Sequence, residues 1–226
     1  SLGEYTALYC SGAVTFEDAV LSVQKRGMFM QAAVPLGIGT MAAVIGISEE
    51  KLNEFCDKVS RKDHIVVLAN INCPKQYVIS GHTAAVEEVL KLSKAEGAIT
   101  VPLAVSAPFH SPLMKKAAAE LTEWLDQIRF KDLNFPLINN AEAEILNKGN
   151  EAKASLIRQM QASVQWEKSM RKLIANGVNM FIEIGPGKVL SGLLKRIDRS
   201  VTALNVADAV SLEQTVTYLG EDKNGS

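Results

Sequence analysis

The sequence predicts an α/β protein in which a smaller α+β unit is inserted between residues 35 and 107. Between those positions the expected elements follow the order strand, helix, strand, strand, helix, strand, which is the ferredoxin-like βαββαβ motif. Outside them helices alternate with short apolar strands, and the continuous apolar run Met180–Ile184 is typical of a strand buried in a parallel sheet. A chain of 226 residues suits one large domain or a domain with an inserted subdomain.

The first part of the chain is expected to form two helices, over 3–12 and 16–34. Thr15 is a plausible N-cap for the second helix, and Glu17 and Asp18 suit the positive end of the helix dipole in its first turn. A Pro- and Gly-containing loop at 35–39 then opens the inserted unit. Its strands are expected over 40–47, 64–70, 76–80 and 99–105, and its helices over 48–59 and 83–96.

The remainder of the chain returns to alternating helices and strands. Helices are expected over 113–128, 151–162, 165–176 and 188–197, and strands over 135–139, 180–184 and 201–206. Gly185-Pro186-Gly187 reads as a strand-to-helix turn, because it lacks the spacing of a phosphate-binding loop. The polar segment 220–226 is expected to be a disordered tail.

Composition narrows the class of protein. Hydrophobic residues make up 47% and charged residues 22%, which is ordinary for a soluble globular protein. The net charge of −1, with both signs interspersed, argues against nucleic acid as a partner, and the absence of a long apolar run argues against a membrane span. The spacing of the cysteines fits no metal template and is consistent with reduced thiols in a cytosolic protein; they are Cys10, Cys56 and Cys73.

The chain opens with Ser-Leu-Gly-Glu-Tyr, which reads as the second half of a G-x-S-x-G nucleophile elbow. Ser1 is therefore the candidate nucleophile, and the backbone N–H of Leu2 is placed at a helix N-terminus, where it can face an oxyanion. Gly3 is expected to let the helix pack close to a sheet. The strand and first glycine of the elbow are not in the sequence, so we expect either processing that frees Ser1 or a fragment that begins at its own active site.

A serine nucleophile needs a base, and the chain has three histidines. His64 lies in a charged loop and is expected to be solvated, and His82 is expected to cap the following helix. His110 lies in a loop that Pro108 and Pro112 stiffen, so its imidazole is held in a fixed place and it is the candidate general base. The alternative for His110 is a purely structural place before a helix.

Arg26 lies on a helix face that is otherwise apolar, near Val23, Met30 and Val34. An unpaired charge in such a place is costly, so the guanidinium is expected to have an anionic partner. That partner is either an internal glutamate or a substrate carboxylate, which arginine binds in bidentate fashion.

Together these features resemble the malonyl-CoA:acyl-carrier-protein transacylases of bacterial fatty-acid synthesis. The resemblance runs from Ser1 to about Asn205. It rests on ordered motifs: SLGEY at 1–5, RGMFMQ at 26–31, NCPKQ at 72–76, VISG at 78–81, FHS at 109–111, VQW at 164–166 and EIGPG at 183–187. It implies a hydrolase-like parallel-sheet core, here incomplete, over 1–34 and 108–219, with a ferredoxin-like subdomain over 35–107.

The resemblance also implies roles for individual residues. Ser1 attacks the malonyl thioester of malonyl-CoA, and His110 takes its proton as general base. The backbone carbonyl of Gln159 orients the imidazole, Arg26 binds the free malonyl carboxylate, and Phe109 matches the malonyl-selective pattern. The acyl-serine then passes to the phosphopantetheine thiol of acyl carrier protein in a ping-pong scheme.

By the same resemblance, malonyl-CoA and acyl carrier protein are the expected partners, and no cofactor or metal is expected beyond the coenzyme A thioester substrate. A cytoplasmic monomer is expected. The family's Gly-Gln-Gly-Ser-Gln segment is absent, which leaves the Leu2 N–H alone of two oxyanion donors, and losing one donor costs about 10²–10³ in rate. The chain by itself is therefore expected to be inactive, with an open apolar face that favours aggregation.

Two other classes of function stay open. Ser1 could be an N-terminal nucleophile of a hydrolase, activated by its own α-amino group, although such folds stack antiparallel sheets. Alternatively, the chain could be an acyltransferase-like domain that binds carrier protein without turnover, or part of a polyketide or fatty-acid synthase. A Gly-His directly before Ser1 in the upstream coding sequence would identify the elbow.

Overall fold

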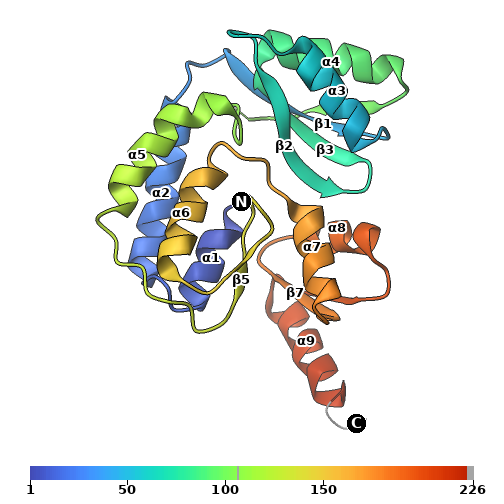
Figure 1. The fold of residues 1–226 in the computed structure, drawn as a ribbon. Coiled ribbons are helices and arrows are strands. Elements are labelled where there is room, and N and C mark those ends of the chain that lie inside the picture. Colours follow the sequence, from blue (N-terminus) through green and yellow to red (C-terminus); the bar gives the residue numbers. More distant parts are fainter. Residues whose placement is uncertain (106, 223–226) are drawn as a thin grey trace. The chain divides into compact units, whose positions relative to one another are not determined.

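The protein has a mixed α/β fold, as the sequence predicts (Figure 1). The computed structural model describes residues 1–105 and 107–222, with the backbone only at 221–222. The chain forms two compact units, Ser1–Ser169 and Met170–Ser226. The predicted domain boundaries at 34/35 and 107/108 both fall inside the first unit, and they stay a prediction.

Four helices of the first unit enclose one apolar core. The elements of this helical part of the unit are α1 (Gly3–Cys10), α2 (Phe16–Ala32), the 3₁₀ helix η1 (Pro112–Met114), α5 (Lys115–Leu125), β5 (Leu137–Ile138), β6 (Ile145–Leu146) and α6 (Gly149–Gln159). Leu8, Leu121 and Leu156, from three different helices, are almost fully buried in this core. The predicted cap of α2 is confirmed, because the Thr15 hydroxyl accepts the Asp18 N–H at 3.1 Å.

An antiparallel sheet forms the other part of the first unit. Its elements are β1 (Gly39–Ile45), α3 (Glu49–Val59), β2 (Val66–Cys73), β3 (Gln76–His82), α4 (Thr83–Ala95) and β4 (Ile99–Pro102). The strands lie in the order β2-β3-β1-β4, and α3 and α4 cover one face (Figure 1). Ile79 of β3 points to that face and is buried against Leu52 of α3 and Val86 of α4, because strand side chains alternate between faces and the covered face is apolar. The predicted βαββαβ order is therefore observed.

Two contacts join the sheet to the helical part of the same unit. The Val164 backbone pairs with β2, donating its N–H to Ala69 and accepting the N–H of Ile71. At the start of β1, a Cβ on Gly39 would lie 2.4 Å from Cγ of Pro108, which is closer than atoms can approach. The loop that follows β4 is thus fixed against the first residue of the sheet.

The second unit contains a small parallel sheet. Its elements are most of α7 (Trp166–Ala175), then β7 (Met180–Ile184), α8 (Val189–Ile197), β8 (Thr202–Val206) and α9 (Ala209–Asp222). β7 and β8 are parallel, as predicted, but the prediction that β7 is buried is wrong: Ile184 is 80% exposed. The reason is that β7 pairs only with β8 among the described strands, so it is an edge and not a central strand.

Two sequence predictions for the second unit have different outcomes. The turn at Gly185-Pro186-Gly187 does join a strand to a helix, and the Glu183 carboxylate accepts the N–H groups of Leu190 and Ser191 at the start of α8. The predicted disorder from residue 220 is wrong as far as Asp222, because α9 continues to that residue. Once a helix has formed, each added residue gains a backbone hydrogen bond. Residues 223–226 lie outside the described residues.

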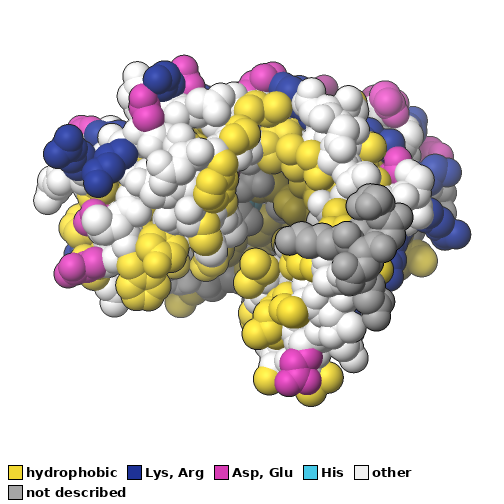
Figure 2. Space-filling view, turned by 90° about the horizontal axis from the view of Figure 1, so that it is seen from below, with side chains coloured by type: hydrophobic (Ala, Val, Ile, Leu, Met, Phe, Trp, Pro, Cys, Tyr) yellow, Lys and Arg dark blue, Asp and Glu magenta, His cyan; other side chains and the backbone are white. Residues whose placement is uncertain are grey.

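Large hydrophobic side chains are exposed along α1 and α2. They line a groove of about 240 Å³, and the most exposed are Leu2, Tyr9, Phe16 and Val20. The sequence-based expectation of an open apolar face agrees with this exposure. Figure 2 shows hydrophobic side chains open to solvent on the face it presents, with positive and negative side chains mixed around the edge. In the described ranges, every helix is too short or too polar to cross a membrane.

Candidate active site

The candidate nucleophile lies immediately before helix α1. Leu2 is the N-cap residue of α1, so the first N–H groups of the helix, near the Ser1 hydroxyl, have no partner within the helix. This is the place that the sequence assigned to an oxyanion donor. A Cβ added at Gly3 would meet nothing within 4 Å among the described residues, which do not include the entering strand of an elbow, so the packing role of Gly3 stays a prediction.

Arg26 extends from the buried face of α2 to Ser1. Its Nη2 donates to Oγ of Ser1 at 2.8 Å and to Oε1 of Gln159 at 3.4 Å, and the guanidinium carbon lies 5.7 Å from the ring centre of Tyr5. The residue is only 7% exposed, and its Nε is buried without a hydrogen-bond partner in the described part of the chain. These hydrogen bonds go to neutral oxygens, so the cation retains its capacity to bind an anion.

His110 is held by the carbonyl predicted from the family motif. Its Nδ1 lies 2.8 Å from the backbone oxygen of Gln159, so Nδ1–H donates to that oxygen and Nε2 is the unprotonated nitrogen of the neutral imidazole. The residue has a φ of 56° and is 4% exposed. Burial lowers the pKa of His110 to about 4, with a smaller lowering from Arg26, while backbone hydrogen bonds to Gln159 and Ala162 act in the opposite direction. The imidazole is neutral at pH 7, as a general base requires.

Gln159, the last residue of α6, connects these groups. Its backbone oxygen binds His110, its side-chain Oε1 accepts from Arg26, and its Nε2 donates to the Glu4 carboxylate at 2.5 Å. Through Gln159, hydrogen bonds connect the exposed Ser1 with the buried Arg26 and His110. The prediction named only the backbone oxygen of Gln159 and missed both its side chain and Glu4. The available signal was an acidic residue on α1 in an otherwise apolar stretch.

The other two histidines are occupied elsewhere. His64 is not solvated as expected: its side chain is 14% exposed, and its Nε2 lies 3.1 Å from a Glu88 oxygen. His82 is at the N-cap position of α4, but its side chain does not cap the helix. Its Nδ1 instead accepts the Ile65 N–H at 2.9 Å. Their described contacts leave His110 as the histidine in the Ser1 network.

Phe109 is half-buried beside His110. It packs against the helical core of the first unit and also against a small cluster on the open face of the sheet, formed by Met41, Ala69 and Val78. The loop that carries it is closed by its own hydrogen bonds, one of them from the Ser111 hydroxyl to the Pro108 carbonyl at 2.6 Å. Phe109 and His110 are therefore held in a well-packed segment.

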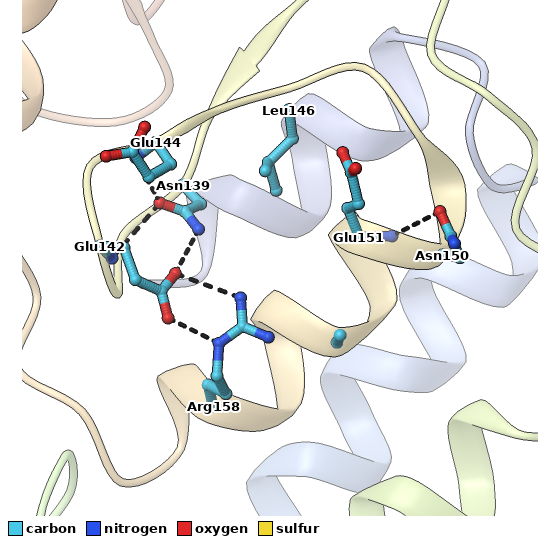
Figure 3. Close-up of a pocket in the computed structure, with 8 residues that line it drawn as sticks. Asn139, Glu142, Glu144, Leu146, Asn150, Glu151 and Arg158 are labelled. Atoms are coloured by element: carbon cyan, nitrogen blue, oxygen red, sulfur yellow. Dashed lines mark hydrogen bonds and ion pairs between the residues drawn. The ribbon is translucent and has the colours of Figure 1, made fainter.

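A separate cavity of about 590 Å³ lies on the outer side of α6 (Figure 3). Its lining is mostly acidic and polar: Asn139, Glu142, Glu144, Leu146, Asn150, Glu151, Ala154 and Arg158. Nε of Arg158 donates to Glu142 at 2.6 Å, in a pair whose side chains are 51% and 36% exposed. In Figure 3 these two side chains point toward one another across the cavity wall. This lining includes none of the predicted site residues.

The sequence matches the acyl transferase domain over residues 1–219. It is 47% identical to the malonyl CoA-acyl carrier protein transacylase of Bacillus subtilis, covering 100% of this chain and 72% of that protein. It is 44% identical to the transacylase of the same name in Staphylococcus aureus, covering 91% of this chain and 67% of that protein.

Solved structures give the same result. The transacylase of Clostridium perfringens superimposes with a TM-score of 0.94 at 42% identity, over 98% of this chain and 70% of that one. A malonyl-transacylase solved in complex with a type II polyketide-synthase acyl carrier protein superimposes with a TM-score of 0.90 at 40% identity, over 93% and 68%. The chain therefore belongs to the acyl transferase domain family, among the malonyl CoA-acyl carrier protein transacylases.

Proposed function

We propose that the protein transfers a malonyl group from coenzyme A to the phosphopantetheine thiol of acyl carrier protein, as a step of fatty-acid biosynthesis and lipid metabolism. The observation that carries the proposal is the hydrogen-bond network in which the buried Arg26 bonds to the exposed Ser1 hydroxyl and Gln159 holds both Arg26 and His110. It occurs in a member of the transacylase family, and it joins a nucleophile, a base and a cation.

The first half-reaction acylates Ser1. His110 Nε2 accepts the hydroxyl proton while Oγ bonds to the thioester carbonyl carbon, which gives a tetrahedral oxyanion. Collapse of that intermediate breaks the carbon–sulfur bond, and the imidazolium returns the proton to the departing coenzyme A thiolate. The backbone N–H of Leu2 is the proposed oxyanion donor.

The second half-reaction is the reverse process with a different thiol. The phosphopantetheine thiol of the carrier protein gives its proton to His110 and attacks the ester carbonyl of malonyl-Ser1. When the intermediate collapses, the Ser1 oxygen leaves and takes the proton back from the imidazolium. The enzyme is regenerated with no change in redox state, so the proposed steps need no oxidant or reductant.

Arg26 supplies recognition of the substrate. A buried guanidinium whose described bonds go to neutral oxygens can form a bidentate pair with the malonyl carboxylate, and charge-assisted hydrogen bonds of this kind are roughly twice as strong as neutral ones. An acetyl group has no carboxylate and gains nothing from Arg26. Phe109 is the proposed second determinant of malonyl selectivity, because it matches the malonyl-selective pattern of related acyltransferases and directly precedes His110.

Further parts of the proposal concern organisation and setting. We infer a hydrolase-like core over 1–34 and 108–219 with an inserted ferredoxin-like subdomain over 35–107; the β2-β3-β1-β4 order and the separate core of that sheet support this division. A cytoplasmic monomer that binds neither nucleic acid nor membrane fits the balanced charge of the sequence. The family assignment favours turnover over a domain that only binds carrier protein, and over an N-terminal-nucleophile hydrolase.

The proposal is tested with the complete gene product that contains these residues. We expect incubation with malonyl-CoA to give a malonyl ester on Ser1, detected by mass spectrometry, and subsequent transfer to acyl carrier protein that carries phosphopantetheine. Carrier protein without phosphopantetheine is the control and stays unmodified. A protein that hydrolyses malonyl-CoA without an acyl-serine, or that binds carrier protein without transfer, would contradict the proposal.

A further inference from the structure

A buried carboxylate with no assigned role lies behind the Ser1 network. Glu4, on the first turn of α1, is 5% exposed. Burial raises the pKa of Glu4, an effect that its hydrogen bonds from Asn140, Gln159 and Ser155 oppose. A carboxylate is rarely kept in such a place unless its oxygens are satisfied, so its partners show what it holds.

All the described partners of Glu4 are hydrogen-bond donors. Oε2 accepts the Asn140 backbone N–H at 3.0 Å and Nε2 of Gln159 at 2.5 Å, and Oε1 accepts the Ser155 hydroxyl at 3.3 Å. An ionised carboxylate accepts hydrogen bonds and donates none, so this surrounding matches its charged form. Asn140 precedes α6 by several residues, while Ser155 and Gln159 lie on α6, so Glu4 joins the first turn of α1 to both segments.

The bond to Gln159 determines which way its side-chain amide points. Nε2 faces the Glu4 carboxylate and Oε1 faces the Arg26 guanidinium. If the amide rotated by half a turn, its oxygen would face the carboxylate and its NH₂ would face the guanidinium. Both contacts would then be repulsive, acceptor against acceptor and donor against donor. The two opposite charges therefore fix one orientation of the amide.

We propose that Glu4 is a positioning residue that locks Gln159, and through Gln159 sets the places of both Arg26 and His110. The proposal rests on the proposed malonyl transfer, because it gives Arg26 and His110 their tasks. Glu4 touches neither of them in a described hydrogen bond and acts through the Gln159 amide. When Glu4 is removed, that amide is free to rotate and the end of α6 loses a fixed point, so the base and the carboxylate-binding arginine both lose their fixed geometry. Misplacing reacting groups by about 1 Å costs up to about 10² in rate.

The first test compares three variants of the complete gene product in the acylation of Ser1 by malonyl-CoA. We expect Glu4→Ala to lower kcat/KM by about 10²-fold. Glu4→Gln retains one acceptor oxygen but loses the charge, so a smaller loss of about 10-fold is expected. Glu151→Gln is the matched control, because Glu151 is also a carboxylate, here on α6, but is exposed at the outer cavity; it is expected to stay within about twofold of wild type.

A double-mutant cycle separates positioning from general destabilisation. In a Gln159→Ala background the backbone carbonyl remains but the amide is gone, so Glu4→Gln is expected to change kcat/KM by less than about twofold. Equal effects of Glu4→Gln in both backgrounds would overturn the proposal, as would a folded Glu4→Gln protein with wild-type kcat/KM. If Glu4→Ala does not fold, the cycle with Glu4→Gln still decides.

A third readout makes failure of this proposal distinguishable from failure of the proposed function. Phenylmethylsulfonyl fluoride sulfonylates an activated serine and requires no malonyl recognition. If the wild type does not accept malonyl-CoA but Glu4→Ala slows sulfonylation of Ser1 about 10-fold or more, the positioning role survives and the proposed function fails. If the wild type accepts malonyl-CoA and Glu4→Ala changes neither the rate of acylation nor the rate of sulfonylation, the proposed function survives and the positioning role of Glu4 fails.

Discussion

Two neighbouring residues at the end of α6 face two different regions of the first unit. Gln159 is fully buried and joins Glu4, Arg26 and His110, whereas Arg158 is half-exposed and pairs with Glu142 at the outer cavity. In the buried region burial shifts the pKa of His110 to about 4, whereas Arg158, whose pKa its bond to Glu142 raises, stays an ordinary surface cation. The comparison shows that the pKa of a titratable side chain shifts strongly where burial excludes water. Clustering of charged side chains at the surface does not have the same effect.

The largest expected difference between the two regions comes from Ser1→Ala. Because this change removes the only atom proposed to carry the acyl group, we expect acyl transfer to fall by about 10⁴-fold or more, measured as malonyl transfer to holo carrier protein. Glu151→Ala, at the outer cavity, is the control and should leave the rate unchanged. Residual transfer within tenfold of wild type would place the nucleophile elsewhere.

Removing Arg26 is expected to have the next largest effect. Arg26→Ala deletes a charge-assisted contact of roughly 1.5–3 kcal/mol, so kcat/KM for malonyl-CoA should fall by about 10–150-fold. Acetyl-CoA makes no such contact, and the preference for malonyl over acetyl should fall by the same factor. Arg158→Ala is the matched arginine control, and a similar loss of preference in that variant would contradict the assignment.

The pH dependence of acylation gives a smaller effect. The base must be neutral, and burial lowers the pKa of His110 to about 4, so kcat/KM for malonyl-CoA should decline with acid only near pH 4. A histidine with an unperturbed pKa of about 6.5 would already lose about tenfold at pH 5.5. A rate profile with its acid limb near 6.5 would show that the imidazole is more hydrated than its burial indicates.

The smallest effect is expected at the outer cavity. The Glu142–Arg158 pair is partly exposed, and pairs of this kind contribute about 0.2–1 kcal/mol. A double-mutant cycle with Glu142→Gln and Arg158→Ala, measured by chemical unfolding, should give a coupling energy in that range, and it should shrink in high salt. A coupling energy above about 2 kcal/mol would show that the Glu142–Arg158 pair does not behave as an ordinary exposed ion pair.

Elements that carry a local signal in the sequence are the ones predicted correctly. The Thr15 cap, the chain order of strands and helices from β1 to β4 and the Gly-Pro-Gly turn all follow from residues close in sequence, and the structure has them. The Glu4–Gln159 contact joins residues 155 positions apart, and neither residue by itself indicates the other. The prediction that β7 is buried is wrong for a similar reason. Its apolar run correctly predicts a parallel strand, but the burial of that strand depends on how many other strands surround it.

The site residues also fall into two groups, those that a sequence motif predicted and those whose contacts or roles it did not. Ser1, Arg26, His110 and the Gln159 carbonyl were placed by motif, and the structure connects all of them by hydrogen bonds. Roles that depend on a bound substrate, such as those of Leu2 and Phe109, remain predictions. The Gln159 side chain was missed because a motif records which residue is present and not which of its atoms makes each contact.

The close approach of Gly39 to Pro108 has a consequence for building chimeras of this family. Residues 39 and 108 share a space that has no room for one more carbon, and His110 follows only two positions later. A graft that imports the segment 35–107 from a relative must therefore keep glycine at its fifth residue, or replace the loop after it as well. The position of His110 thus depends on a contact between residues on the two sides of the predicted boundary at 107/108.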